Sequence, residues 1–199
     1  MTDMRPLFLL TVAAILLQAA CRDDRAPAVQ DVNVAAAEHF VDAFYSFDGD
    51  RLKSTLTSAR DSVPSIVYYQ GWAAGGHYSI VTRRPCVPEG IASASCSITV
   101  KDDLMRALGI PFDVTDTFHV TFANGQIVAV RTSSNDLKVF NDAEEWVRRK
   151  RPELVKQPCQ GYFEGGPTPE LCVQAMVRGY AEFATSDDFP DDPMKELAK

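Results

Sequence analysis

Apolar positions between residues 34 and 76 recur every three to four residues, which is the period of amphipathic helices. In the first stretch, Phe40, Val41 and Phe44 share one face and give it an aromatic character. Asp48-Gly49-Asp50 interrupts the pattern, and Gly75-Gly76 ends it. The pattern therefore predicts three helices, over residues 34–47, 52–63 and 64–73.

After Gly76 the period falls to two residues, which indicates half-buried strands. Asn124-Gly125 is the dipeptide that a two-residue hairpin turn prefers, because both positions need positive φ. The predicted strands are 77–84, 95–101, 114–123 and 126–133, with a short helix over 102–109 between the second and the third.

An uninterrupted hairpin would fix the register of its two strands. If Ala123 faces Gln126 across the turn, Phe118 faces Arg131 further along the same pair. Asp116 then lies diagonally from Arg131 on one face, within reach of a long side chain. We therefore expect a carboxylate–guanidinium pair, which would hold Asp116 ionised in a structural role.

Helical periodicity returns after the hairpin. Asn141 and Glu144 have the spacing of a capping box and predict the start of a helix that ends before Pro152. Thr168-Pro169 predicts the start of a last helix. We assign residues 152–199 to a helical C-terminal appendage and tail.

The longest apolar run, residues 6–17, is followed by Ala19-Ala20-Cys21 and then by polar residues. A run of about twelve residues is too short for a membrane span, which needs about 20, and is typical of a signal peptide. The junction resembles the bacterial lipobox, in which the cysteine is diacylated, although Gln18 stands where that motif prefers an aliphatic residue. We expect a signal peptide over 1–20, lipidation of Cys21 and a tether over 21–33. A plain secretion signal or an uncleaved anchor are the alternatives.

Cysteine number agrees with export. Without Cys21, four cysteines remain, and an even number downstream of an export signal predicts two disulfides. Three pairings are open, and we favour the sequential one, in which each bridge closes a short loop and stabilises the fold by about 3 kcal/mol. The spacing lacks CxxC motifs and the three histidines are dispersed, so we expect no metal site. The expected bridges are Cys86–Cys96 and Cys159–Cys172.

Composition narrows the class of protein. With 199 residues, of which 46% are hydrophobic, the chain can build one domain with a substantial core. A formal charge of −7 argues against nucleic acid as a partner, because phosphates need a basic face. The sequence contains no G-x-S-x-G nucleophile elbow of the kind that carries a catalytic serine. It also has no glycine-rich phosphate loop, and we expect no cofactor.

Three segments resemble the nuclear transport factor 2-like superfamily, which includes the SnoaL-like polyketide cyclases and the ketosteroid isomerases. They are FVDAFYSFDGDRL at 40–52, DTFHVTFANGQIVAVRT at 116–132 and NDAEEW at 141–146. The likeness covers residues 34–151 and rests on architecture more than on a diagnostic motif. It implies an α+β domain in which a curved antiparallel sheet packs on N-terminal helices and encloses a conical, mostly apolar pocket.

The resemblance also suggests which side chains line that pocket. Tyr69, Trp72, Asp116 and Arg131 are expected near its mouth as ligand-binding residues. In an enzyme of this superfamily, Asp116 would be the base and Tyr69 the hydrogen-bond donor. The tyrosine–aspartate–aspartate set of the isomerases cannot be matched residue by residue, so fold analogy alone does not imply catalysis.

Three functions follow as hypotheses. The first is an exported, lipid-anchored and non-catalytic envelope protein that binds a small apolar ligand or a protein partner. The second is an enzyme of the isomerase, dehydratase or cyclase type. The third is an assembly module of an envelope complex, which predicts a filled core and an exposed apolar patch on the sheet. The superfamily's open sheets also make a homodimer one expected assembly.

Overall fold

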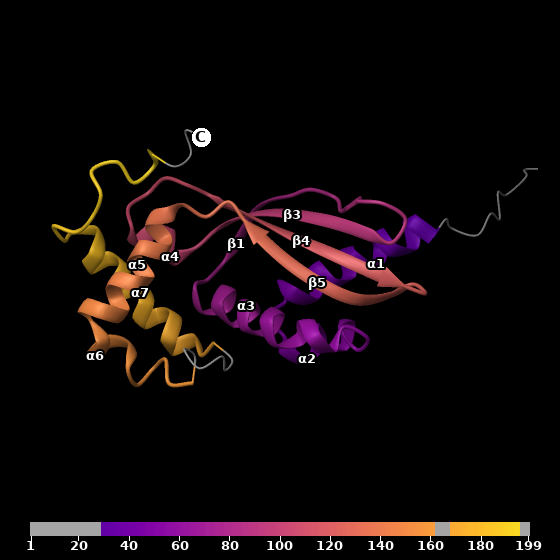
Figure 1. Ribbon diagram of the computed structural model, residues 1–199, viewed down its shortest axis with the longest axis horizontal. Coiled ribbons are helices and arrows are strands. Elements are labelled where there is room, and N and C mark those ends of the chain that lie inside the picture. Colours follow the sequence, from indigo (N-terminus) through magenta and orange to yellow (C-terminus); the bar gives the residue numbers. More distant parts are fainter. Residues whose placement is uncertain (1–28, 162–167, 196–199) are drawn as a thin grey trace, which may run out of the picture.

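The computed structural model describes residues 29–161 and 168–195, and it is an α+β fold in which five antiparallel strands pack on helices (Figure 1). The signal peptide, Cys21 and most of the tether lie outside the described residues. The helices are α1 (Val29–Phe44), α2 (Gly49–Thr55), the short 3₁₀ helix η1 (Arg60–Ser62), α3 (Val63–Gly75), α4 (Asp103–Ala107), α5 (Lys138–Lys150), α6 (Pro152–Val155) and α7 (Glu170–Ala184). The strands are β1 (Ser79–Arg83), β2 (Val87–Pro88), β3 (Ser93–Lys101), β4 (Val114–Ala123) and β5 (Gln126–Ser134).

The sheet has the order β1-β3-β4-β5, with β2 paired to β3 beside β1. Buried and less buried residues alternate along β3 and β4, as expected for strands with one face on the core. The inward face carries Ile98, Phe118 and Val120, which are fully buried. Helices α1, α2 and α3 lie alongside the strands of the sheet, while α5, α6 and α7 gather beyond one end of the strands (Figure 1).

The β4–β5 hairpin follows the expected register only next to its turn. Phe122 faces Ile127 as predicted, but a β-bulge follows at Val128 and shifts the remaining pairs by one residue. His119, and not Phe118, therefore faces Arg131. The expected pair between Asp116 and Arg131 is wrong, because the two residues lie on opposite faces of the sheet.

The bulge has a clear physical cause. Ile127 and Val130 are three residues apart and both are buried, which strict alternation along a strand does not allow. Without the extra residue, Arg131 would point into the core as an unpaired buried charge, which is costly. The hydroxyl of Ser62 accepts the Val130 N–H at 3.0 Å and so satisfies a buried backbone donor beside the bulge.

Two helices begin earlier than the sequence pattern indicates. Helix α1 begins at Val29, inside the segment assigned to the tether. Helix α5 begins at Lys138, so the capping box at Asn141 and Glu144 is wrong. The earlier start places Val139 and Phe140 on the buried face of α5, and this gain of apolar burial outweighs the local capping preference.

The C-terminal helices complete the same core as the sheet and α3. Helix α7 contacts α3, α4 and α5 along its length. The fully buried Tyr180 on α7 packs edge-on against Phe140, with 5.3 Å between the ring centroids. Gly179 permits a close approach of α7 to α5, since a Cβ atom there would lie 2.4 Å from a Val147 methyl carbon.

Both disulfides have the predicted pairing. Cys86 is bonded to Cys96 with 4.3 Å between the Cα atoms, and Cys159 is bonded to Cys172 with 4.5 Å. The first bridge ties the segment before β2 to β3, and the second ties the chain after α6 to the first turn of α7. Disulfides of this kind indicate a non-cytoplasmic environment.

Candidate functional site

Three elements converge on one carboxyl group beneath the sheet. Asp116 lies on the inward face of β4, and its side chain is only 1% exposed. The Tyr45 hydroxyl, at the C-terminal end of α1, donates a hydrogen bond of 3.3 Å to Asp116 Oδ2. Tyr69 of α3 lies beside the same carboxyl group. The second oxygen, Oδ1, is buried and has no hydrogen-bond partner among the described residues.

Burial raises the pKa of Asp116 to about 6, because loss of water penalises the charged form. The Tyr69 and Tyr45 hydroxyls act in the opposite direction, since they stabilise the carboxylate. The nearby Asp136 and Asp102 carboxylates raise the pKa further. Asp116 is therefore a group that changes its protonation state close to neutral pH.

A second buried carboxyl group lies in the same region. Asp102 is the N-cap of α4, and its Oδ1 accepts the Met105 N–H at 2.7 Å, whereas Oδ2 is buried without a hydrogen-bond partner among the described residues. Burial raises the pKa of Asp102 to about 6. Burial and then the Asp102 and Asp116 charges raise the pKa of the Tyr78 phenol well above its usual value. We call Tyr45, Tyr69, Tyr78, Asp102 and Asp116 the carboxyl–tyrosine cluster.

Aromatic side chains fill the space between the cluster and the sheet. Phe118, two residues after Asp116 on β4, packs against Phe44 with 4.8 Å between the ring centroids and against Phe40 with 5.5 Å. Of five hollows on the described part of the protein, none is lined by Asp116 or Tyr69. The conical pocket expected from the superfamily resemblance therefore stays a prediction.

The other two expected ligand-binding residues lie away from this cluster. Trp72 is buried and packs against Phe140 of α5, with 6.3 Å between the ring centroids. Arg131 is exposed and faces His119 on the outer side of the sheet. The structure thus brings Tyr69 and Asp116 together, and it separates Trp72 and Arg131 from them. Ligand binding by these four residues stays a prediction.

Sequence reasoning did not single out Tyr45 or Tyr78. Tyr45 follows Val41 by four residues, so helical spacing places it near the buried face of α1, and this signal could have identified it. Tyr78 follows the positive-φ residue His77 at the turn into β1. Its approach to two carboxyl groups depends on tertiary contacts and has no counterpart in local sequence.

A groove of about 420 Å³ lies at the other end of the sheet, between the start of α1 and the β4–β5 turn. Asn33 donates a hydrogen bond from Nδ2 to the Ile91 carbonyl oxygen at 3.2 Å. The Asn33 side chain is 4% exposed, and its Oδ1 has no hydrogen-bond partner among the described residues. The groove offers mostly apolar walls. Its lining includes Val29, Val32, Asn33, Ile91, Phe122 and Asn124.

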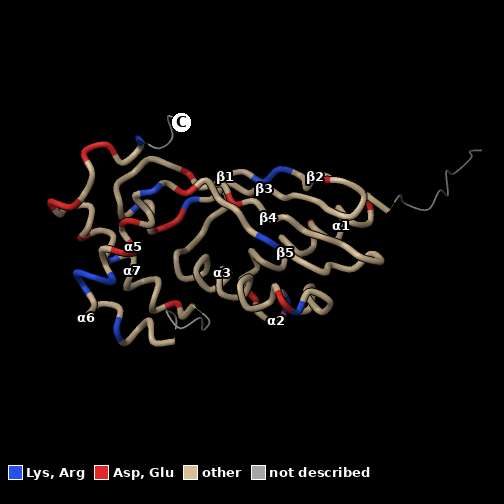
Figure 2. Tube along the Cα trace, viewed as in Figure 1, with Lys and Arg blue, Asp and Glu red and all other residues tan. Residues whose placement is uncertain are grey.

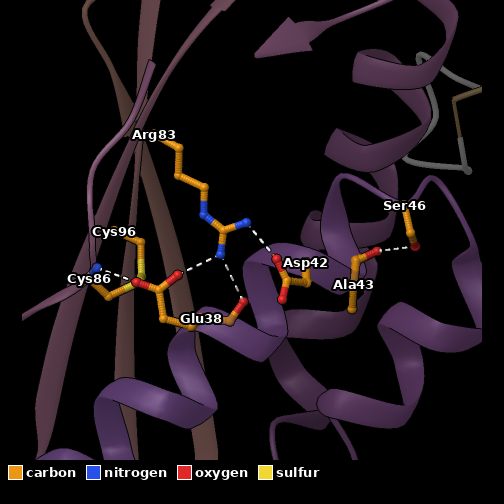
Figure 3. Close-up of polar contacts among 7 residues, drawn as sticks. All are labelled: Glu38, Asp42, Ala43, Ser46, Arg83, Cys86 and Cys96. Carbon is orange, nitrogen blue, oxygen red and sulfur yellow. Dashed lines mark hydrogen bonds and ion pairs between the residues drawn. A yellow bond between two sulfur atoms is a disulfide. The ribbon is translucent and has the colours of Figure 1, made fainter. Parts of the chain in front are cut away.

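A cluster of charged groups beside the first disulfide holds β1 against α1 (Figure 3). The Arg83 guanidinium donates to Asp42 and to both the carboxylate and the carbonyl oxygen of Glu38, the last at 3.3 Å. The other Glu38 carboxylate oxygen accepts the Cys86 N–H. The two terminal nitrogens of Arg83 and the Cys86 N–H all have acceptors, so we interpret this charged cluster as structural.

Metal binding has no support in residues 29–161 and 168–195, where no group of three or more histidine, cysteine or acidic side chains could hold an ion. In the same ranges no helix is long and apolar enough to cross a membrane. No protein-family model matches the chain, and neither the curated proteins nor the solved structures contain a match.

Proposed function

We propose that the protein is an exported, lipid-anchored and non-catalytic binding protein of the cell envelope, with a nuclear transport factor 2-like domain. The two disulfides support a location outside the cytoplasm. The apolar run over 6–17 and the following Cys21 support export and attachment to a membrane. The three helices and the long hairpin support the superfamily resemblance.

The groove beside α1 is the observation that carries the binding proposal. Its volume of about 420 Å³ is in the range of sites for small molecules. Its walls are mostly apolar, with Val29, Val32, Ile91 and Phe122 among the lining residues. The occupant that fits is therefore an apolar group, from a small molecule or from a protein partner.

Native mass spectrometry of the protein extracted from its own cells tests this proposal. We expect a mature chain that begins at Cys21, with added acyl mass and a retained apolar molecule. Ala92 also lines the groove, so Ala92→Trp should fill it and abolish retention. Ala123→Trp is the matched control, because Ala123 is exposed and does not line the groove. Equal retention by both variants would contradict the groove as the binding site.

An enzyme of the isomerase, dehydratase or cyclase type is the second candidate. The pKa of about 6 for Asp116, beside the Tyr69 hydroxyl, favours it, because a general base works best with a pKa near the operating pH. The 1% exposure of Asp116 is against it, since a substrate must reach the carboxylate. Loss of a measured turnover in Asp116→Asn, with the fold retained, would support this candidate over the first.

A further inference from the structure

Large apolar side chains are exposed around the rim of the groove. Ile91, in the connection between β2 and β3, is 80% exposed, and Val29 and Val32 of α1 are 65% and 42% exposed. All three line the groove. We call Val29, Val32 and Ile91 the rim patch. Exposed apolar groups gathered in this way mark a surface that contacts another apolar body.

The rim patch lies where the chain arrives from Cys21. Helix α1 begins with Val29 at one end of the molecule, while α5, α6 and α7 lie at the opposite end (Figure 1). Seven residues lie between Cys21 and Val29, so eight Cα-to-Cα steps join them. At about 3.6 Å per residue the connection spans at most about 29 Å. A lipid on Cys21 therefore keeps the rim patch close to the bilayer that holds it.

The distribution of charge favours the same orientation. Acidic residues gather in the C-terminal segment that follows α7, and both signs of charge occur along α5 and α6, whereas the end with the rim patch carries fewer charges (Figure 2). Asp31 and Glu89 are the acidic residues in the first turn of α1 and just before the β2–β3 connection. The four aspartates over 187–192 make the C-terminal segment the part that an anionic lipid surface repels most strongly.

We propose that the rim patch rests on the lipid surface of the membrane that holds Cys21, so that the groove opens onto the bilayer. This inference depends on the lipid attachment proposed above. Apolar faces of anchored proteins enter the boundary between headgroups and acyl chains by about 5–10 Å. The patch is too small to bind lipid alone, and the anchor supplies the proximity that makes a weak contact persist.

Tryptophan quenching in vesicles tests the contact. The full-length lipid-modified protein is placed in vesicles of zwitterionic and anionic phospholipids with brominated acyl chains. We expect the added tryptophan of Ile91→Trp to shift to shorter wavelength and lose emission to the bromines. The matched control is Leu171→Trp, because Leu171 is also exposed, at 67%, but belongs to α7 and does not line the groove. The native Trp72 and Trp146 are buried and present in both variants.

The mass of the N-terminal peptide, measured on the same samples, separates the two proposals. Acyl mass on Cys21 with quenching of I91W alone supports the inference. Acyl mass with no quenching, or with equal quenching of I91W and L171W, overturns the inference and leaves the lipid attachment standing. Chemical cross-linking of I91W to a protein partner or to a second copy, without quenching, also overturns the inference. Absence of acyl mass overturns both.

Discussion

Tyr45, which directly follows α1, donates a 3.3 Å hydrogen bond to Asp116 on β4, across a separation of 71 residues in the chain. The bond joins the first helix to the centre of the sheet through a carboxyl group that is buried and raised in pKa. Because Arg131 points away on the other face, no cation on the hairpin compensates the charge. Asp116 therefore stabilises the fold best when it is protonated.

Asp116 and Asp102 should make the protein less stable as the pH rises toward neutrality. Both have a pKa of about 6, above the usual 3.8, so the folded state binds their protons more tightly. Their contribution is fully present below the unfolded pKa and is lost as the pH rises through about 6. In urea unfolding, Asp116→Asn should gain about 2 kcal/mol over the wild type at pH 7.5 and little at pH 4. Asp61→Asn, at an exposed position, is the control; a gain for D116N that is the same at both pH values would contradict the prediction.

Ser62→Ala should destabilise the protein by about 1–3 kcal/mol, because it leaves the buried Val130 N–H without an acceptor. The free energy of unfolding from urea titration measures the loss. Ser58 lies in the connection before η1, and its hydroxyl bonds only the exposed Gln126 side chain. Ser58→Ala should therefore cost less than about 0.5 kcal/mol. Equal losses would show that Ser62 does not support the bulge.

Gly179→Ala should destabilise the contact between α7 and α5 by about 1–3 kcal/mol, since its Cβ would overlap the Val147 methyl groups. Adding Val147→Ala should recover part of the loss, because it removes the atoms that clash. Thermal unfolding of the two single variants and the double variant measures this coupling. Arg178→Ala, at an exposed position on α7, controls for a general effect on the helix; strictly additive losses in the G179A/V147A pair would count against the clash.

Replacing Cys159 and Cys172 together by serine should lower the free energy of unfolding by about 3 kcal/mol, because the bridge no longer restricts the unfolded chain. When reductant is added, the free energy of unfolding of this variant should fall only by the contribution of the Cys86–Cys96 bridge. In the untreated wild type, an alkylating reagent should modify none of these four cysteines. Free thiols at any of them would contradict a non-cytoplasmic environment.

Local sequence was sufficient for the elements whose signals are local. Asn124-Gly125 predicted the hairpin turn, and the local pattern predicted helices over 64–73 and 102–109, which overlap α3 and α4. The disulfide pairing followed from short loops, where proximity in the chain and in space coincide. In each case the residues that decide the conformation are within a few positions of it.

The sequence-based predictions were wrong where the burial of residues distant in the chain determines the local structure. The bulge at Val128 exists because both Ile127 and Val130 need the core and Arg131 needs solvent, and a register counted from the turn ignores this requirement. The start of α5 depends on the packing of Phe140 against Tyr180 of α7, which is distant in the sequence. The carboxyl–tyrosine cluster joins five elements or connections. Asp116 and Tyr69 were named from the sequence, and helical spacing could also have identified Tyr45, but no local signal marks Tyr78.

The position of α7 also affects when the chain can fold. Helix α3, complete by Gly75, packs against α7, and the Thr168 hydroxyl donates to the Tyr68 carbonyl oxygen across 100 residues of chain. A nascent chain that has emerged only as far as the hairpin leaves that side of α3 exposed to water. The core is completed late in synthesis, when α7 arrives, because contacts of long sequence separation form slowly. Under the export proposed above, a core that closes only after α7 is made leaves the chain unfolded while it passes a translocation channel.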